Sequence, residues 1–96
     1  MAKGTIVGIE NSPAFRTNLG AMSWVASTVR FIAYDAGGHE LWRSDVAVNG
    51  LAQFPLPVPL RYGRVTAEVI AGAPVVPYAS VIDNVSGDPI FITAQY

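Results

Sequence analysis

The sequence predicts an all-β protein: an antiparallel Ig-like β-sandwich of roughly seven to eight short strands, with a small β-barrel as the alternative. Apolar and polar residues alternate with a period of two along most of the chain, as they do in half-buried strands. Turn-forming residues separate the alternating runs, and no window holds an apolar helical stripe longer than about two turns. Alternation does not reveal which strands pair, so sandwich and barrel both remain open.

Length and composition indicate one domain that covers residues 1–96. Of the 96 residues, 51% are hydrophobic and 14% are charged, a balance that excludes intrinsic disorder. A folded chain of this mass should expose about 5,300 Å² of surface. The net charge of −1 argues against a nucleic-acid partner, and no apolar run is long enough to span a membrane. Because cysteine is absent, disulfides and thiolate metal sites are excluded, and we expect no metal ion and no cofactor.

The first half of the chain holds three strand candidates. Gly4–Ile9 is a short apolar run, and the turn-forming residues Asn11–Pro13 separate it from Phe15–Ser23. Thr28–Tyr34 alternates cleanly and is followed by Asp35–Gly38. Glycine adopts positive φ without strain, so this segment is expected to close a hairpin.

Four further candidates follow along the chain, rich in β-branched and aromatic residues. Asn49–Gly50 is the strongest short turn signal in the chain and is expected to end the first of them. Asp83–Asp88 is interpreted as a hairpin loop. The four candidates are Leu41–Val48, Arg64–Ala71, Val75–Asp83 and Pro89–Thr93.

Proline occupies every second position between Phe54 and Leu60. Alternate N–H groups of a strand point to opposite edges, so these prolines would remove donors from one edge only. The segment is therefore predicted to be a protected edge strand. A polyproline II segment recognised by another domain is the alternative.

No catalytic or metal-binding motif is recognisable. The single histidine, His39, follows a Gly-Gly turn and is typical of a solvated turn residue. The acidic loop that contains Asp83 and Asp88 offers too few oxygen ligands for calcium. A small β-fold enzyme is the least favoured function, and it would use His39, Glu68 or Tyr78.

Several predicted strands are apolar on both faces, whereas an ordinary sandwich exposes polar outer faces to water. The extra apolar face requires a cover, and self-association is the simplest one. We therefore predict a non-catalytic structural or assembly module that forms a homo-oligomer or an extracellular filament. The side chains expected to carry this assembly are Ile32, Tyr34, Trp42, Ile70, Tyr78 and Ile82.

The alternative function is a polysaccharide- or peptide-binding accessory module of a bacterial secreted protein. Exposed aromatic rings stack on the apolar surfaces of such ligands. The candidate rings are those of Trp24, Trp42, Tyr62 and Tyr96.

Three motifs resemble a known family: Phe15–Gly20 (FRTNLG), Asp35–Gly38 (DAGG) and Tyr78–Pro89 (YASVIDNVSGDP). The chain resembles the uncharacterised Ig-like β-rich modules found at the C-termini of bacterial secreted and cell-surface proteins. The resemblance implies a sandwich that lies outside the cell or on its surface, as a mature form without a signal peptide, and it implies no enzymatic activity. No leader segment is recognisable, so a cytoplasmic location also stays open.

The residues shared with this family are expected to have structural roles. Arg16 would form an ion pair with Asp83 or Asp88 and so hold the strand register. Asn18 would bond backbone groups at a strand end. The resemblance carries over no catalytic residue.

Overall fold

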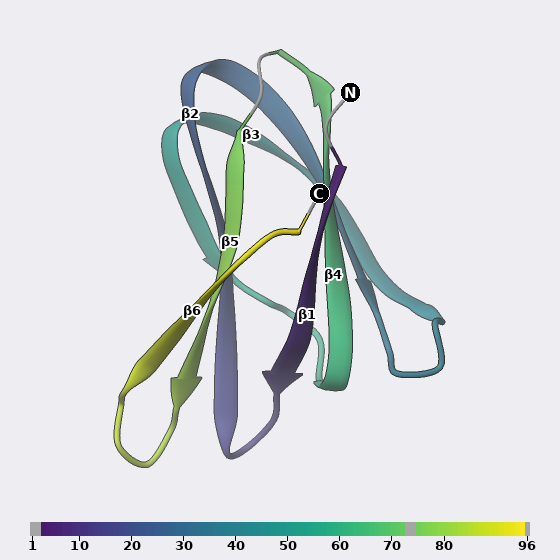
Figure 1. Cartoon of the computed structure of the whole chain (residues 1–96), viewed down its shortest axis with the longest axis vertical. Coiled ribbons are helices and arrows are strands. Elements are labelled where there is room, and N and C mark those ends of the chain that lie inside the picture. Colours follow the sequence, from purple (N-terminus) through teal and green to yellow (C-terminus); the bar gives the residue numbers. More distant parts are fainter. Residues whose placement is uncertain (1–2, 73–74, 96) are drawn as a thin grey trace.

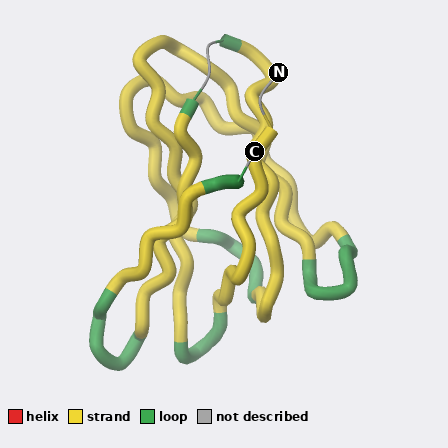
Figure 2. Tube along the Cα trace, in the orientation of Figure 1, coloured by secondary structure: helices red, strands yellow, loops and turns green. Residues whose placement is uncertain are grey.

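The computed structural model describes residues 3–72 and 75–95, and this part of the chain is all β (Figure 1, Figure 2). Six antiparallel strands form one sheet that curls into a nearly closed barrel. The predicted sandwich of seven to eight strands is therefore wrong, and the small barrel that stood as its alternative is correct. The strands are β1 (Lys3–Asn11), β2 (Phe15–Tyr34), β3 (Glu40–Pro55), β4 (Leu60–Ala71), β5 (Val76–Asp83) and β6 (Pro89–Thr93).

The long strand β2 organises the barrel. β3 follows β2 from the Tyr34–Glu40 pair to the Asn18–Pro55 pair. The C-terminal half of β2 also pairs with β4, and its N-terminal half also pairs with β5. β1 then borders β4, and β6 borders β5. Thr5 and Gln95 exchange two backbone hydrogen bonds of 2.8 Å, and this bridge joins β1 to the segment that follows β6.

Two strands are longer than the alternation predicts, which lowers the strand count. β2 contains both of the strands predicted at Phe15–Ser23 and Thr28–Tyr34. The turn predicted at Asn49–Gly50 does not form, because both residues lie inside β3. Alternation breaks at these positions, but the chain does not reverse there.

A bulge bends the β2–β3 ribbon instead. Ser23 pairs with Gly50 and the next pair is Ser27 with Val48, so residues 24–26 of β2 face a single residue of β3. Gly50 has a φ of 85°, which glycine adopts in a bulge as readily as in a turn. The hydroxyls of Ser23 and Ser27 donate to the Val25 carbonyl at 2.6 and 3.1 Å and so satisfy the looped-out backbone.

The proline-rich segment is mainly a connection and not the predicted edge strand. Its first two residues end β3, and Leu56 to Pro59 lead into β4. The buried Leu56 donates its N–H to the Thr17 carbonyl at 2.9 Å. The Asn11 side-chain amide donates to the carbonyls of Leu56 and Val58 at 3.0 and 2.7 Å. Hydrogen bonds from one side chain thus replace strand pairing, because the prolines lack N–H donors.

One cluster of side chains centred on Phe31 fills the barrel. Phe54 packs edge-on against Phe31 with centroids 5.4 Å apart, and Trp42 lies 6.0 Å from Phe54. In the described residues, no buried side-chain nitrogen or oxygen lacks a hydrogen-bond partner. The accessible surface of 5277 Å² agrees with the value of about 5,300 Å² expected from the mass. The largest fully buried side chains are Phe31, Ile6, Ile9, Leu19, Val29, Val48, Val65 and Thr17.

Candidate functional site

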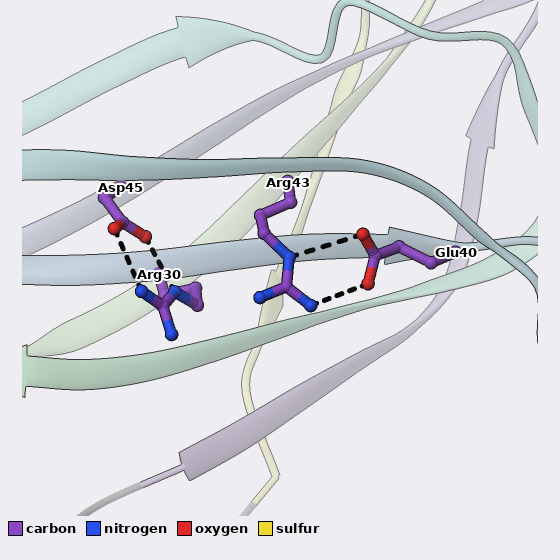
Figure 3. A network of polar contacts seen from close by, with 4 residues as sticks. All are labelled: Arg30, Glu40, Arg43 and Asp45. Carbon is purple, nitrogen blue, oxygen red and sulfur yellow. Dashed lines mark hydrogen bonds and ion pairs between the residues drawn. The ribbon is translucent and has the colours of Figure 1, made fainter.

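Charged side chains of the protein itself lie on the outer face that β2 shares with β3. Arg30 donates to Asp45 at 2.8 and 3.1 Å, and Arg43 donates to Glu40 at 2.8 and 3.3 Å (Figure 3). Arginine covers apolar surface with its aliphatic part while its charged end stays in water. Ile32 pairs with Arg43 across the ladder and is only 8% exposed. Ile32 therefore offers no free surface for assembly, contrary to the prediction.

The same ion pairs shift the pKa values of their carboxyl groups. The hydrogen bond from Arg30 lowers the pKa of Asp45, and the hydrogen bond from Arg43 lowers the pKa of Glu40. Both pairs are exposed, so solvent weakens their attraction. Their main effect is to make this outer face polar.

Four other side chains predicted for assembly are half-buried: Tyr34, Trp42, Ile70 and Ile82. The Arg64 guanidinium lies 4.4 Å from the centroid of the Tyr34 ring and covers that ring. Trp42 points inward and packs against the core. Ile70 and Ile82 each keep part of their side chain exposed.

An exposed apolar surface lies instead at the bend of the β2–β3 ribbon. Met22 pairs with Leu51 on one side and with Val76 on the other, so these three side chains form one row across β3, β2 and β5. Trp24 follows Met22 on the bulge and is 88% exposed, and Leu51 is 64% exposed. We call these four residues the bend patch. A pocket of about 400 Å³ opens beside it, lined by Met22, Ser23, Trp24, Asn49, Gly50 and Leu51.

The sequence pattern does not predict the bend patch, because the patch depends on strand pairing. Leu51 and Val76 lie on β3 and β5, and both contact Met22 only through the register of β2. Trp24 is exposed because the bulge turns it out of the ladder. The available signal was the break in alternation between residues 22 and 27.

Tyr78 was predicted for assembly and lies next to the bend patch. It pairs with Gly20, one row away from Met22, and its hydroxyl donates to Oε1 of Gln53 at 2.6 Å. The Phe91 ring lies 6.3 Å from the Tyr78 ring. Tyr78 thus connects the bend patch to β6.

The predicted ion pair between Arg16 and Asp83 or Asp88 is absent. The Arg16 guanidinium donates to Oδ1 of Asn84 at 2.7 Å. The Asp83 carboxylate accepts the N–H groups of residues 85 and 86 at 2.8 and 3.3 Å and so stabilises its own loop. Asn84 also donates to the Pro13 carbonyl at 3.1 Å, and it therefore joins the β5–β6 loop to the β1–β2 loop.

Asn11 has the backbone-bonding role that was predicted for Asn18. Its Oδ1 accepts the Thr17 N–H at 3.1 Å, in addition to its two bonds with the proline-rich segment. Asn18 pairs with Pro55 and Ser80 in the ladder, and the structure shows no hydrogen bond from its side chain. The sequence favoured Asn18 because it belongs to the Phe15–Gly20 motif, whereas Asn11 lies in what looked like an ordinary turn.

The candidate catalytic residues lie apart. His39 is exposed in the β2–β3 turn and hydrogen-bonds to its neighbour Asp35, whose pKa is lowered by a hydrogen bond from the His39 backbone. Glu68 lies on β4 opposite Arg30, and Tyr78 lies on β5. No hydrogen bond joins His39, Glu68 and Tyr78. In residues 3–72 and 75–95, no group of three or more acidic or histidine side chains could hold a metal ion.

The candidate ligand-binding rings do not form one platform. Trp24 and Tyr62 are both exposed, but Trp24 lies in the middle of β2 while Tyr62 lies beside the C-terminal end of that strand. Trp42 belongs to the margin of the core. Tyr96 lies outside the described residues.

Comparisons with models of protein families, with curated proteins and with solved structures find no match to this chain. The resemblance to secreted β-rich modules therefore stays a prediction. Among the described residues, no helix is long and apolar enough to cross a membrane.

Proposed function

We propose that this protein is a non-catalytic assembly module that associates with further copies of itself through the bend patch. The observation that carries this proposal is the exposed, uncharged row of Met22, Leu51 and Val76 with Trp24 beside it. Exposure of these apolar side chains to water does not stabilise a monomer. Exposed apolar patches of this kind mark protein interfaces.

The geometry of the bend patch favours a second copy as its partner. Trp24 forms part of the wall of a pocket of about 400 Å³ that has no charged residue in its lining. Under a two-fold axis, each Trp24 would enter the pocket of the other copy, so the surface is complementary to itself. A Trp side chain buries roughly 150–250 Å². Two inserted rings and the adjoining row would approach the roughly 1,000 Å² that a specific interface needs.

Charge does not oppose this association. The chain carries a net charge of −1, and the ion pairs of Arg30 and Arg43 do not involve any residue of the bend patch. The resemblance to secreted modules supports a location outside the cell or on its surface. A polysaccharide- or peptide-binding role is the second candidate, because Trp24 could stack on a ligand instead.

The test is the solution mass of the full chain, measured by light scattering over a dilution series. Leu51→Lys should raise the concentration needed for association about tenfold or more, because a charge would enter the interface. Val85→Lys is the matched control: Val85 is 94% exposed in the β5–β6 loop, away from the bend patch. Equal effects of the two substitutions, or a 10.2 kDa monomer at every concentration, would overturn the proposal.

Tryptophan fluorescence distinguishes the two candidate functions. Trp42 is half-buried in the monomer, so a change on association reports mainly on Trp24. Self-association predicts an emission maximum that moves to shorter wavelength as protein concentration rises. An emission maximum that does not change with protein concentration but shifts when soluble oligosaccharides are added would favour the ligand-binding module.

A further inference from the structure

The outer edge of β6 is open and uncharged. Within residues 3–72 and 75–95, β6 pairs only with β5, and its sequence, Pro-Ile-Phe-Ile-Thr, carries no charge. Ile90 and Phe91 are 62% and 67% exposed. The free edge of β3 differs, because Glu40, Arg43 and Asp45 lie along it and charged edges resist further pairing.

The hydrogen-bond alternation shows which groups of β6 point outward. The Asp83 N–H donates to the Asp88 carbonyl at 3.1 Å, so that pair is hydrogen-bonded. Bonded and non-bonded pairs alternate along an antiparallel ladder, which makes Ser80–Phe91 a non-bonded pair. Phe91 and Thr93 therefore direct their N–H and C=O groups away from β5. Pro89 has the same orientation, so its backbone nitrogen points away from β5. Proline is tolerated there because no N–H donor is needed to pair with β5.

Gln95 supports this orientation. It has the same parity as Phe91 and Thr93, and it uses both of its backbone groups to bond Thr5 of β1. Figure 1 shows β1 and β6 separating away from this bridge. In residues 3–72 and 75–95, β5 is the only strand that pairs with Phe91 and Thr93.

We propose that the outer edge of β6 pairs antiparallel with β6 of a second copy, about a two-fold axis at Phe91. The two Phe91 residues would exchange N–H···O=C bonds, and each Thr93 N–H would reach the Pro89 carbonyl of the other copy. The outward N–H and C=O groups of one β6 thus match those of the other. Pro89 lacks an N–H, so the only hydrogen bonds lost are those that its nitrogen would donate to Thr93 of the other copy. The pairing extends the sheet from one molecule into the next.

This inference rests on the proposed assembly function and adds a second, separate interface to it. A chain with two different two-fold interfaces still has one interface free after the other has been used. Assembly therefore continues beyond a dimer, to an open filament where the two axes do not meet and to a closed dihedral oligomer where they do.

A cysteine cross-link tests the register. The chain contains no cysteine, so Phe91→Cys introduces a single thiol. Directly paired residues have Cα atoms about 5.5 Å apart, within the range that a disulfide spans. Under mild oxidation Phe91→Cys should form covalent dimers at least about tenfold faster than Val85→Cys, an exposed position on the neighbouring loop. Equal rates for the two variants would overturn the pairing.

Solution mass separates this inference from the proposed function. Phe91→Lys places two like charges opposite each other at the axis and should stop assembly at a dimer held by the bend patch. Leu51→Lys should stop it at a dimer held by β6, and the double variant should be monomeric. A monomeric Leu51→Lys variant would overturn the β6 pairing and leave the bend patch standing. Dimers that persist in Leu51→Lys but are absent in Phe91→Lys would support pairing through β6 and would overturn association through the bend patch.

A second substitution guards against misfolding of the lysine variant. Thr93→Pro removes only an outward N–H, so the pairing of β6 with β5 should survive. It should weaken assembly in the same direction as Phe91→Lys. Undiminished assembly in a folded Thr93→Pro variant would count against the proposed register.

Discussion

The Tyr78 ring lies over Gly20, its partner in the β2–β5 ladder, and its hydroxyl bonds Gln53 on β3 at 2.6 Å. A Cβ at position 20 would overlap atoms of the Tyr78 ring. Glycine is therefore required for a ring from β5 to cross β2 and reach β3. This contact ties three strands together beside the bend patch.

We expect Gly20→Ala to lower the free energy of unfolding by about 1–3 kcal/mol, since the ring must move and its hydrogen bond is lost. Urea denaturation measures the change. In a Tyr78→Ala background the same substitution should change stability by less than about 0.5 kcal/mol. Equal losses in both backgrounds would show that the ring is not the reason.

Gly50→Ala should lower stability by about 1 kcal/mol, because Gly50 has a φ of 85° that other residues adopt with strain. A Cβ at this position meets no atom within 4 Å, so the loss comes from the backbone alone. Asn tolerates the left-handed region better than Ala. Thermal unfolding should therefore rank Gly50→Asn above Gly50→Ala, and the reverse order would contradict this explanation.

Asn11→Ala should lower the free energy of unfolding by about 2–3 kcal/mol, because it leaves the Thr17 N–H and two carbonyls of the proline-rich segment without partners. Asn18→Ala is the matched control and should change stability by less than about 0.5 kcal/mol. Chemical denaturation measures the free energy of unfolding of both variants. Similar losses would place an unrecognised hydrogen bond at Asn18.

Tyr62 has a φ of 52°, which is unusual for a residue other than glycine. Its side chain is exposed, so substitutions there report mainly on the backbone. We expect Tyr62→Asn to be neutral or slightly stabilising and Tyr62→Val to lower stability by about 1–2 kcal/mol. The midpoint of urea unfolding measures both, and a Val variant as stable as the Asn variant would contradict the assignment.

Stability should fall in acid because of the ion pair between Arg30 and Asp45. Arg30 lowers the pKa of Asp45 in the folded state, so the pair stabilises the protein above the ordinary pKa of an aspartic acid. That contribution disappears as the pH falls through the lower folded value. Asp45→Asn should make the curve of unfolding free energy against pH flatter in this range. If the two proteins lose the same unfolding free energy as the pH falls, the ion pair is not the cause of the acid sensitivity.

The predicted strand locations were largely correct, while their number was not. Period-two alternation reports local burial, and it located the residues of β4, β5 and β6 within a few positions. It missed that β2 continues through Ser23–Ser27, and the turn signal at Asn49–Gly50 belongs to the bulge that faces those residues. A bulge and a turn both need glycine at positive φ, so composition alone does not separate them.

Strand register also determines how exposed each of the predicted assembly residues is. Ile32 is apolar and faces outward, as alternation indicates, yet Arg43 from the next strand covers it. Met22 and Trp24 are also apolar, but they are 44% and 88% exposed. Whether an outward residue is covered depends on its cross-strand neighbours, and strand register determines those neighbours.

By itself the sequence determined that this protein is all β, uncharged overall to within one unit, and free of disulfides. These properties follow from composition and from periodicity, which are local. The tertiary structure alone decided that the sheet closes into a barrel, that Trp24 is exposed at a bend, and that Phe91 lies on an open edge. Those features depend on which strands pair and in what register, and pairing joins residues that are distant in the chain.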